Sequence, residues 1–303
     1  MAEHIVKKMK ELDFVTPSEY VDRSKGYTRD PVVAEAGGAV QMGFEVARLD
    51  PGGHVETHVH SFEESLYISD GEMVVDTVEG SYRLGKGDYC LLPLGAPHAF
   101  RNIGDQTVSF SEMKAPLPRE RFSFDTYFPP RIAAVDPVTI DVRDPRNRYF
   151  GHIDPENMDP AMQTQDKLAL SASMRTALLV YSGISVKMMV DPDLGADLST
   201  MFMVQYQQGG FAGAHDHPLE EAYQIMVGRV EATFDGQKYE LGSGDVAWAG
   251  VGCVHEFLNI GDGVVRWLET QAPQPPPRHS YRFARDWKYL ENALASETRD
   301  DPH

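Results

Sequence analysis

The chain has 303 residues and a formal net charge of −18, with 42% hydrophobic and 24% charged residues. These proportions are typical of a folded globular protein, and the length allows one large core or two cores of ordinary size. The acidic balance argues against binding to nucleic acid or to an anionic membrane, because contacts with phosphate require clustered Lys and Arg.

The first 40 residues are expected to form an irregular N-terminal arm that opens with a short helix. The opening stretch is charged throughout and lacks the apolar core of a signal peptide, and no apolar run is long enough to span a membrane. Cys90 and Cys253 occupy non-equivalent positions of the sequence and do not suggest a disulfide framework. We therefore expect a cytoplasmic protein whose partner is a small-molecule substrate, and association into a homo-oligomer stays open.

The rest of the chain divides into two β-rich segments with a linker and a tail. Residues 41–130 contain short runs with period-two alternation, broken by Gly, Asp and Pro, and no helical periodicity between them. This pattern predicts an antiparallel barrel or sandwich. A Pro-rich linker is expected at 131–164, and a second barrel at 165–272. A tail follows at 273–303, with a short helix over residues 286–296 that offers a surface for a partner barrel or subunit.

Three histidines and a glutamate recur at a constant interval of 157 residues. These candidate metal ligands are His58, His60, Glu64 and His98 in the first copy, and His215, His217, Glu221 and His255 in the second. Several flanking glycines keep the same interval. Because chance would not preserve all four residue types in both copies, the chain is an internal duplication with a full ligand set in each half.

The spacing of these residues suits a metal site inside a barrel. Residues i and i+2 of a strand face the same side, so each His-x-His pair aims two imidazoles into the interior. The glutamate is expected on the next strand and the last histidine on a third. Three neutral imidazoles and one carboxylate leave two of six octahedral positions open. This set suits Fe(II), Mn(II), Co(II), Ni(II) or Cu(II) better than a closed structural zinc site.

The same residues closely resemble the two sequence motifs of the cupin superfamily. The pattern G-x4-H-x-H-x3-E-x6-G runs from Gly53 to Gly71, and G-x5-P-x-G-x2-H-x3-N runs from Gly87 to Asn102. The second copy, at 210–228 and 244–259, departs only at Gly250, where the first has Pro93. The resemblance implies an all-β bicupin, with two jelly-roll barrels in tandem and a metal-binding interior in each.

Strand periodicity favours the second barrel for catalysis. Counting two residues on from each glutamate places Tyr223 beside the second site, where the first has the inert Leu66. We therefore predict Tyr223 and Glu221 as catalytic residues, with a core tyrosine as the alternative. Phe100 and Phe257 are expected to line the two cavities.

Other side chains are expected to stand outside the chemistry. Glu56 shares the face of His58 and is expected to be solvated rather than to act as a base. Arg266 and Lys187 are expected to be ordinary exposed charges rather than anchors for an anionic substrate.

Three functions remain open at this point. The resemblance favours an Fe(II) dioxygenase that acts on a small organic acid, enol or phenol. The alternative is a Mn(II)-dependent non-oxidative enzyme, since the two-barrel layout is similar to ureidoglycine aminohydrolase and oxalate decarboxylase. A third reading is a bicupin that binds a small molecule without catalysis. The sequence permits two metal ions per chain, or one if a single barrel has kept its metal.

Overall fold

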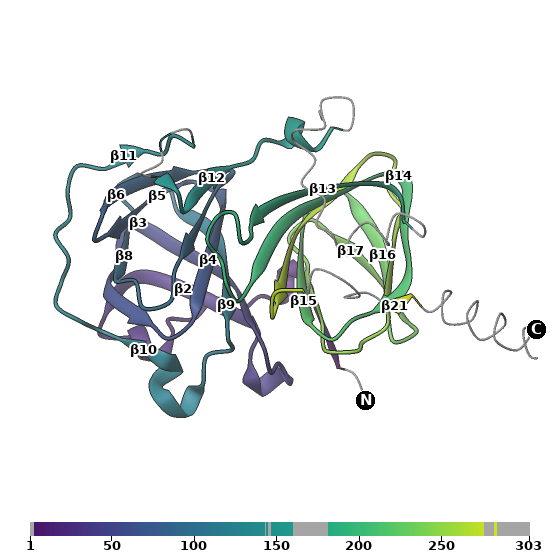
Figure 1. The fold of residues 1–303 in the computed structure, drawn as a ribbon, viewed down its shortest axis with the longest axis horizontal. Coiled ribbons are helices and arrows are strands. Elements are labelled where there is room, and N and C mark those ends of the chain that lie inside the picture. The colour runs from purple at the N-terminus through teal and green to yellow at the C-terminus, as the bar shows by residue number, and fades with distance from the viewer. Residues whose placement is uncertain (1–2, 143, 145–146, 160–180, 276–281, 284–303) are drawn as a thin grey trace, which may run out of the picture.

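The computed structural model describes residues 3–142, 144, 147–159, 181–275 and 282–283, which form two β-barrels side by side (Figure 1). The expected all-β class with tandem barrels is confirmed. The helix expected at residues 286–296 lies outside the described residues. Within the described part, no helix is long and apolar enough to cross a membrane.

The N-terminal barrel is one mainly antiparallel sheet curled around an interior that includes a cluster of apolar side chains. Its main strands, in chain order, are β2 (Ser24–Val33), β3 (Gly43–His60), β4 (Glu63–Asp70), β5 (Glu72–Thr77), β6 (Gly80–Gly85), β7 (Asp88–Leu92), β8 (His98–Arg101) and β9 (Val108–Ala115). β3 is long enough to pair with β2, β8 and β9 in turn. Leu66, Phe100 and Phe110 are among the buried side chains inside.

The C-terminal barrel repeats this arrangement. Its strands are β13 (Tyr181–Val190), β14 (Thr200–Asp216), β15 (Glu220–Val227), β16 (Arg229–Phe234), β17 (Gln237–Gly242), β18 (Val246–Ala249), β19 (His255–Asn259) and β20 (Val265–Ala272). β13 follows β2 by the same 157 residues that separate the ligand sets, so the structural repeat begins earlier than the metal motifs. Tyr223, Phe257 and Trp267 lie in its interior.

The expectation of an irregular arm opening with a short helix was wrong. The chain begins with a strand, β1 (His4–Lys7), and β2 occupies much of the remaining arm. Gly26 and Pro31 interrupt the apolar alternation of β2 and hide it from a periodicity argument. Among the described residues the helical elements are short 3-10 turns: η1 (Met9–Glu11), η2 (Ser18–Tyr20), η3 (Glu35–Gly37), η4 (Glu120–Asp125) and η6 (Pro155–Met158).

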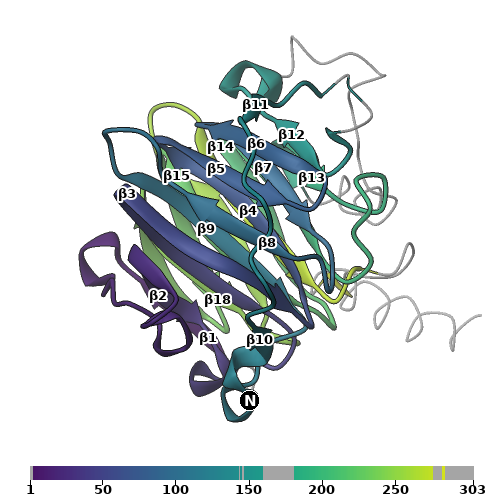
Figure 2. The same cartoon turned by 90° about the vertical axis from the view of Figure 1, so that its left-hand side faces the viewer.

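Edge strands are exchanged between the two halves. β1 pairs with β18 of the C-terminal barrel, and β12 (Phe150–His152), from the linker, pairs with β7, the counterpart of β18 in the N-terminal barrel. Figure 2 shows β1 lying beside β18. Three further short strands complete the sheets: β10 (Thr126–Tyr127) and β21 (Arg282–Phe283) on β3 and β14, and β11 (Val138–Thr139) on β6.

The barrels meet through an apolar layer to which both contribute, including Phe44 and Met113 on one side and Met203 and Leu268 on the other. Two buried glutamates, one from each barrel, accept hydrogen bonds from the other half of the chain across this layer. Glu63 accepts hydrogen bonds from the amides of Asp197 and Leu198, at 2.7 and 3.0 Å, and from Ser199 Oγ at 3.1 Å. Its counterpart, Glu220, accepts from the three amides at positions 40–42, at 2.8–3.2 Å. The interface is therefore pseudo-symmetric. We call each of these glutamates, with the groups that donate to it, a clamp; each clamp glutamate directly precedes the glutamate of a candidate metal site in the sequence.

Candidate metal centres

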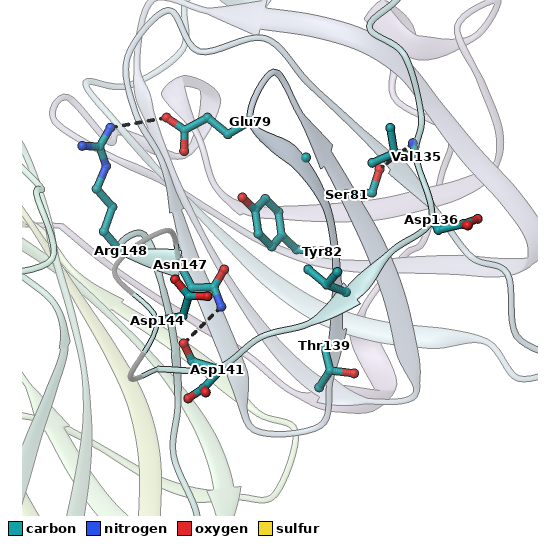
Figure 3. A pocket seen from close by; sticks show the side chains of 12 residues that line it. Glu79, Ser81, Tyr82, Val135, Asp136, Thr139, Asp141, Asp144, Asn147 and Arg148 are labelled. Carbon is teal, nitrogen blue, oxygen red and sulfur yellow. Dashed lines mark hydrogen bonds and ion pairs between the residues drawn. The ribbon is translucent and has the colours of Figure 1, made fainter.

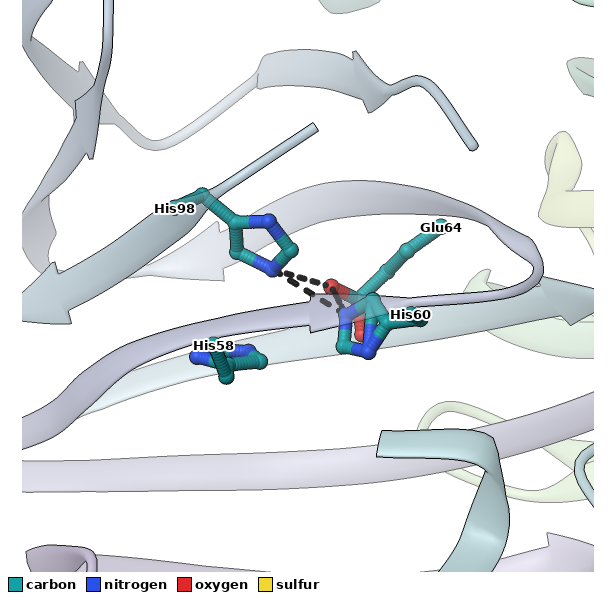
Figure 4. Close-up of side chains that lie close together, drawn as sticks. All are labelled: His58, His60, Glu64 and His98. Atoms are coloured by element: carbon teal, nitrogen blue, oxygen red, sulfur yellow. Dashed lines mark hydrogen bonds and ion pairs between the residues drawn. The ribbon is translucent and has the colours of Figure 1, made fainter. Parts of the chain in front are cut away.

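The first candidate centre lies inside the N-terminal barrel, where the ends of three strands meet. β3 ends with His58 and His60, β4 supplies Glu64, and β8 begins with His98, which pairs with His58 across the strands. All four side chains are buried. Glu64 Oε2 lies 3.2 Å from Nε2 of both His60 and His98, and those two nitrogens are 3.1 Å apart (Figure 4). The four ligand atoms lie within 4.8 Å of one another.

Backbone carbonyls fix the imidazoles in the orientation that a metal requires. His58 Nδ1 and His98 Nδ1 donate to the carbonyls of Glu56 and Ala96, at 2.7 and 2.9 Å. This leaves each Nε2 as the lone-pair nitrogen. His58 Nε2 is buried without a hydrogen-bond partner among the described residues. Burial and the neighbouring His98 lower the pKa of His58 well below its usual value, so the ring stays neutral and able to bind a metal.

The second candidate centre repeats this design in the C-terminal barrel. His215 lies at the end of β14 and His217 directly after it, Glu221 lies in β15, and His255 begins β19. Each histidine has its Nδ1 2.8–2.9 Å from a backbone carbonyl two residues away. The ligand nitrogens of the three histidines lie within 4.8 Å of one another. Glu221 Oε2 lies 2.9 Å from His217 Nε2 and 3.3 Å from His255 Nε2.

Electrostatics at the second centre favour a charged carboxylate. Burial alone would raise the pKa of Glu221, but His217 and His255 hold it well below its usual value. Burial alone would lower the pKa of His217, yet contact with Glu221 raises it. Three histidines therefore cluster inside each barrel, with Glu64 as part of the first cluster and Glu221 beside His217 and His255 of the second. These donor sets fit a divalent transition metal ion.

A small cavity of about 20 Å³ adjoins the second centre. Its walls are mainly aromatic and aliphatic, and include Phe202, Phe257 and Trp267 beside His215 and His255. A buried water needs about 10–15 Å³, so the space admits a ligand of one or two heavy atoms without rearrangement. Tyr223 lines this cavity as expected, and its hydroxyl donates to Glu221 Oε2. The structure therefore places Tyr223 as a partner of the candidate ligand Glu221.

Sequence reasoning missed Glu269, a second carboxyl group in the wall of this cavity. Trp267 Nε1 donates to its Oε2 at 2.9 Å, and Gln271 Nε2 lies 3.4 Å from its Oε1. Burial and the nearby Glu221 raise the pKa of Glu269 well above its usual value, which favours the neutral carboxylic acid over the carboxylate. The repeat interval contained a signal for this residue, because Glu112 occupies the same position in the first copy.

The interior of the N-terminal barrel contains a buried charge network that the sequence analysis also missed. Lys114 Nζ lies 2.7 Å from Glu45 and 3.1 Å from Glu112, and Arg29 Nη1 lies 3.0 Å from Glu45. Tyr27 donates to Glu112 at 2.7 Å. Burial and Arg29 would lower the pKa of Lys114, but Glu45 and Glu112 raise it, so the ammonium group stays charged.

The corresponding positions of the C-terminal barrel are largely uncharged. Val186 replaces Arg29, Phe202 replaces Glu45 and Gln271 replaces Lys114, each 157 residues further on. The two barrels have the same candidate ligands, but the side chains around these ligands are charged in the first barrel and largely uncharged in the second.

The remaining predicted residues lie as follows. Phe100 packs edge-on to His58, with ring centroids 5.5 Å apart. Glu56 is half exposed and pairs with Arg23 at 3.1 Å, as expected of a solvated side chain. Arg266 is half-buried rather than freely exposed, since its guanidinium donates to Gln205. Neither Arg266 nor Lys187 belongs to the lining of the C-terminal cavity.

A larger pocket, of about 610 Å³, opens where the linker crosses β6 (Figure 3). Acidic and polar side chains dominate its lining, and Arg148 pairs with Glu79 at 3.4 Å across one side. Asn147 Nδ2 donates to the carbonyl of Asp141 at 3.1 Å. The lining contains no histidine and none of the candidate ligands, so it is separate from both metal centres.

Comparisons with known proteins agree with this architecture. The cupin domain family matches the chain twice, over residues 45–113 and 202–270. Polyketide synthase CurC of Streptomyces cyaneus is 30% identical over 77 residues, which are 25% of this chain and 49% of that protein. The match thus spans about half the length of this curated relative.

Two solved structures resemble nearly the whole chain. Oxalate decarboxylase of Lactobacillus farciminis, solved as a formate complex, covers 99% of this chain and 94% of its own, with a TM-score of 0.62 and 15% identity. Salicylate 1,2-dioxygenase of Pseudoaminobacter salicylatoxidans covers 89% of this chain and 81% of its own, with a TM-score of 0.64 and 14% identity. At these identities the likeness shows the fold alone.

Proposed function

This chain belongs to the cupin superfamily and carries two cupin domains in tandem, and from that premise we propose that it is a metal-dependent enzyme. Each barrel binds one divalent transition metal ion, through His58, His60, Glu64 and His98 in the first and His215, His217, Glu221 and His255 in the second. The observation that carries this proposal is the orientation of the imidazoles. Five of the six have Nδ1 held at a backbone carbonyl, which directs Nε2 toward a shared buried point.

We assign catalysis to the C-terminal centre. A bound metal ion would supply Lewis acidity and, if redox-active, electrons for dioxygen chemistry. The chain's own residues supply the rest. Tyr223 orients Glu221, Phe202 and Phe257 exclude water, and Glu269 presents a carboxyl group, fixed by Trp267, to whatever occupies the cavity. Glu269 is therefore the candidate for moving a proton to or from the substrate.

Our first choice of reaction is an Fe(II)-dependent dioxygenase reaction on a small organic acid, enol or phenol in the cytoplasm. Its support is the apolar, aromatic character of the wall of the C-terminal cavity, which suits an organic substrate once side-chain movement opens the cavity beyond its volume of about 20 Å³.

The second choice is a Mn(II)-dependent decarboxylation or hydrolysis. The observation that favours it is Glu269, because a carboxyl group placed to transfer protons is of use to a reaction without an oxidant. A bicupin that binds a small molecule without turnover is the remaining alternative.

The test starts with metal identity and stoichiometry in protein purified anaerobically without an affinity tag. Two iron atoms per chain, with dioxygen uptake in the presence of an enol or phenol, would support the dioxygenase. Manganese, with release of CO2 or ammonia in the absence of oxygen, would support the non-oxidative enzyme. Failure to bind any divalent metal after supplementation would refute the metal-dependent enzyme altogether.

A further inference from the structure

The two glutamate ligands are oriented alike but have different outer partners. In both barrels Oε2 faces the histidines, and Oε1 is directed toward the strand alongside, β9 or β20. In the N-terminal barrel Lys114 Nζ lies 3.9 Å from Glu64 Oε1. In the C-terminal barrel Gln271 Nε2 donates to Glu221 Oε1. Lys114 and Gln271 occupy the same position of the repeat, so one structural place carries a cation in one half and a neutral amide in the other.

The side chains that surround Lys114 and Gln271 also differ between the two barrels. Glu45 and Glu112 contact Lys114 directly and compensate its burial. Around Gln271 the partners are an alcohol and a carboxyl group, since Thr200 Oγ1 donates to its Oε1 at 3.3 Å and Glu269 lies near its Nε2. All of these side chains are buried, where charges interact more strongly than in water.

We propose that the residue at positions 114 and 271 is a positioning residue that tunes the glutamate ligand, and so makes the two metal centres electronically unequal. An ammonium group beside Glu64 Oε1 draws charge away from the oxygen that faces the metal and repels a cation bound there. An amide beside Glu221 Oε1 orients the carboxylate without adding a charge. The N-terminal centre therefore holds a divalent ion less tightly than its ligand set alone would allow. This inference rests on the metal centres proposed above and extends them to a division of roles between the barrels.

The exchange of the two residues tests this directly. Lys114→Gln is placed in a protein whose C-terminal centre is disabled by Glu221→Ala and His255→Ala. Gln271→Lys is placed in a protein whose N-terminal centre is disabled by Glu64→Ala and His98→Ala. The probe is Co(II), with affinity measured by competition against a chelator and coordination followed by the visible absorption bands. Lys114→Gln is expected to tighten binding at least tenfold and Gln271→Lys to weaken it at least tenfold, with the band pattern retained.

Two further variants distinguish the effect of the charge on metal affinity from a failure to fold and from the loss of a hydrogen bond. The double variant Lys114→Gln/Glu45→Gln removes one cation and one anion, and replaces the single variant if that does not fold. Gln271→Met removes the amide without adding a charge and is expected to weaken binding less than Gln271→Lys does.

Three outcomes would overturn the inference. These are changes below threefold in both exchanges, weaker binding in Lys114→Gln or tighter binding in Gln271→Lys, or equal weakening by Met and Lys at position 271. If neither single-centre parent binds Co(II), the metal centres themselves are refuted rather than their tuning alone.

Discussion

Glu63 offers the sharpest test of how the two barrels are joined. It is a residue of the N-terminal barrel, yet its carboxylate accepts three hydrogen bonds from positions 197–199 of the C-terminal half. A hydrogen bond to a charged group contributes about 1.5–3 kcal/mol, and a buried donor left unpaired costs about 1–3 kcal/mol. Glu63→Gln keeps the shape and one acceptor oxygen, so one or two of the three bonds are lost. The expected destabilisation is about 2–4 kcal/mol.

The assay is equilibrium unfolding of the metal-free protein in urea, followed by tryptophan fluorescence. Two of the three tryptophans, Trp248 and Trp267, are buried in the C-terminal barrel, so the signal reports on the half that does not contain the substitution. The matched control is Glu72→Gln, in an exposed pair with Arg83, where the loss is expected to stay below about 1 kcal/mol. If Glu63→Gln shifts the unfolding transition no further than Glu72→Gln does, the clamp is not a source of stability and the reasoning fails.

Three further predictions concern the metal centres and the N-terminal strand. Glu221→Ala is expected to abolish turnover, whereas Glu64→Ala lowers the metal content by one ion per chain and leaves turnover largely intact; elemental analysis with an activity assay checks both, and the reverse pattern would transfer catalysis to the N-terminal barrel. Chelation is expected to lower the thermal midpoint, because free metal at one hundred times its Kd stabilises a site by about 2.7 kcal/mol; an unchanged midpoint would contradict binding to the folded state. Burial alone would raise the pKa of Asp245, but hydrogen bonds from the amides of Gly242 and Met9 and from Lys8 lower it. Its contribution is therefore present above the usual carboxyl pKa and is lost as the pH falls through the lowered value, so Asp245→Asn should destabilise the protein by about 1–2 kcal/mol at pH 7 and by little near pH 2. An equal effect at both pH values would show that the charge of Asp245 is irrelevant.

The proximity of the candidate ligands in each barrel could be predicted from the sequence because it depends on spacing alone. A His-x-His pair at a strand end, with its repeat 157 residues later, needs no knowledge of how the strands pair. The positions of Lys114 and Glu269 near the candidate ligands depend instead on which strands pair and in which register. Both lie on the strand beside the glutamate ligand, and register shifts next to that strand, such as the one between Ile225 and Val227, prevent counting from one strand to the next.

The N-terminal strand was missed for a different reason. The segment around Ile5 and Val6 is short and lies between polar residues, with two lysines after it, so its local sequence favours no particular structure. It becomes a strand because β18 presents an edge to it from the other half of the chain. Such a long-range partner overrides local propensity, and a single sequence read in order gives no sign of it.

The exchange of β1 bears on how the protein is made. His4 pairs with Ala249, so β1 leaves the ribosome long before β18 and finds its partner only after the strands between them have been synthesised. Until then the β1 segment has no partner strand, and a chaperone or an exposed sheet edge of another chain has time to bind it. The N-terminal barrel can close around its own ligands early, since β12 follows it closely, but the C-terminal barrel depends on a segment made long before. A ribosome-bound chain stalled before residue 246 should therefore leave β1 open to protease, and synthesis through β18 followed by release should protect it.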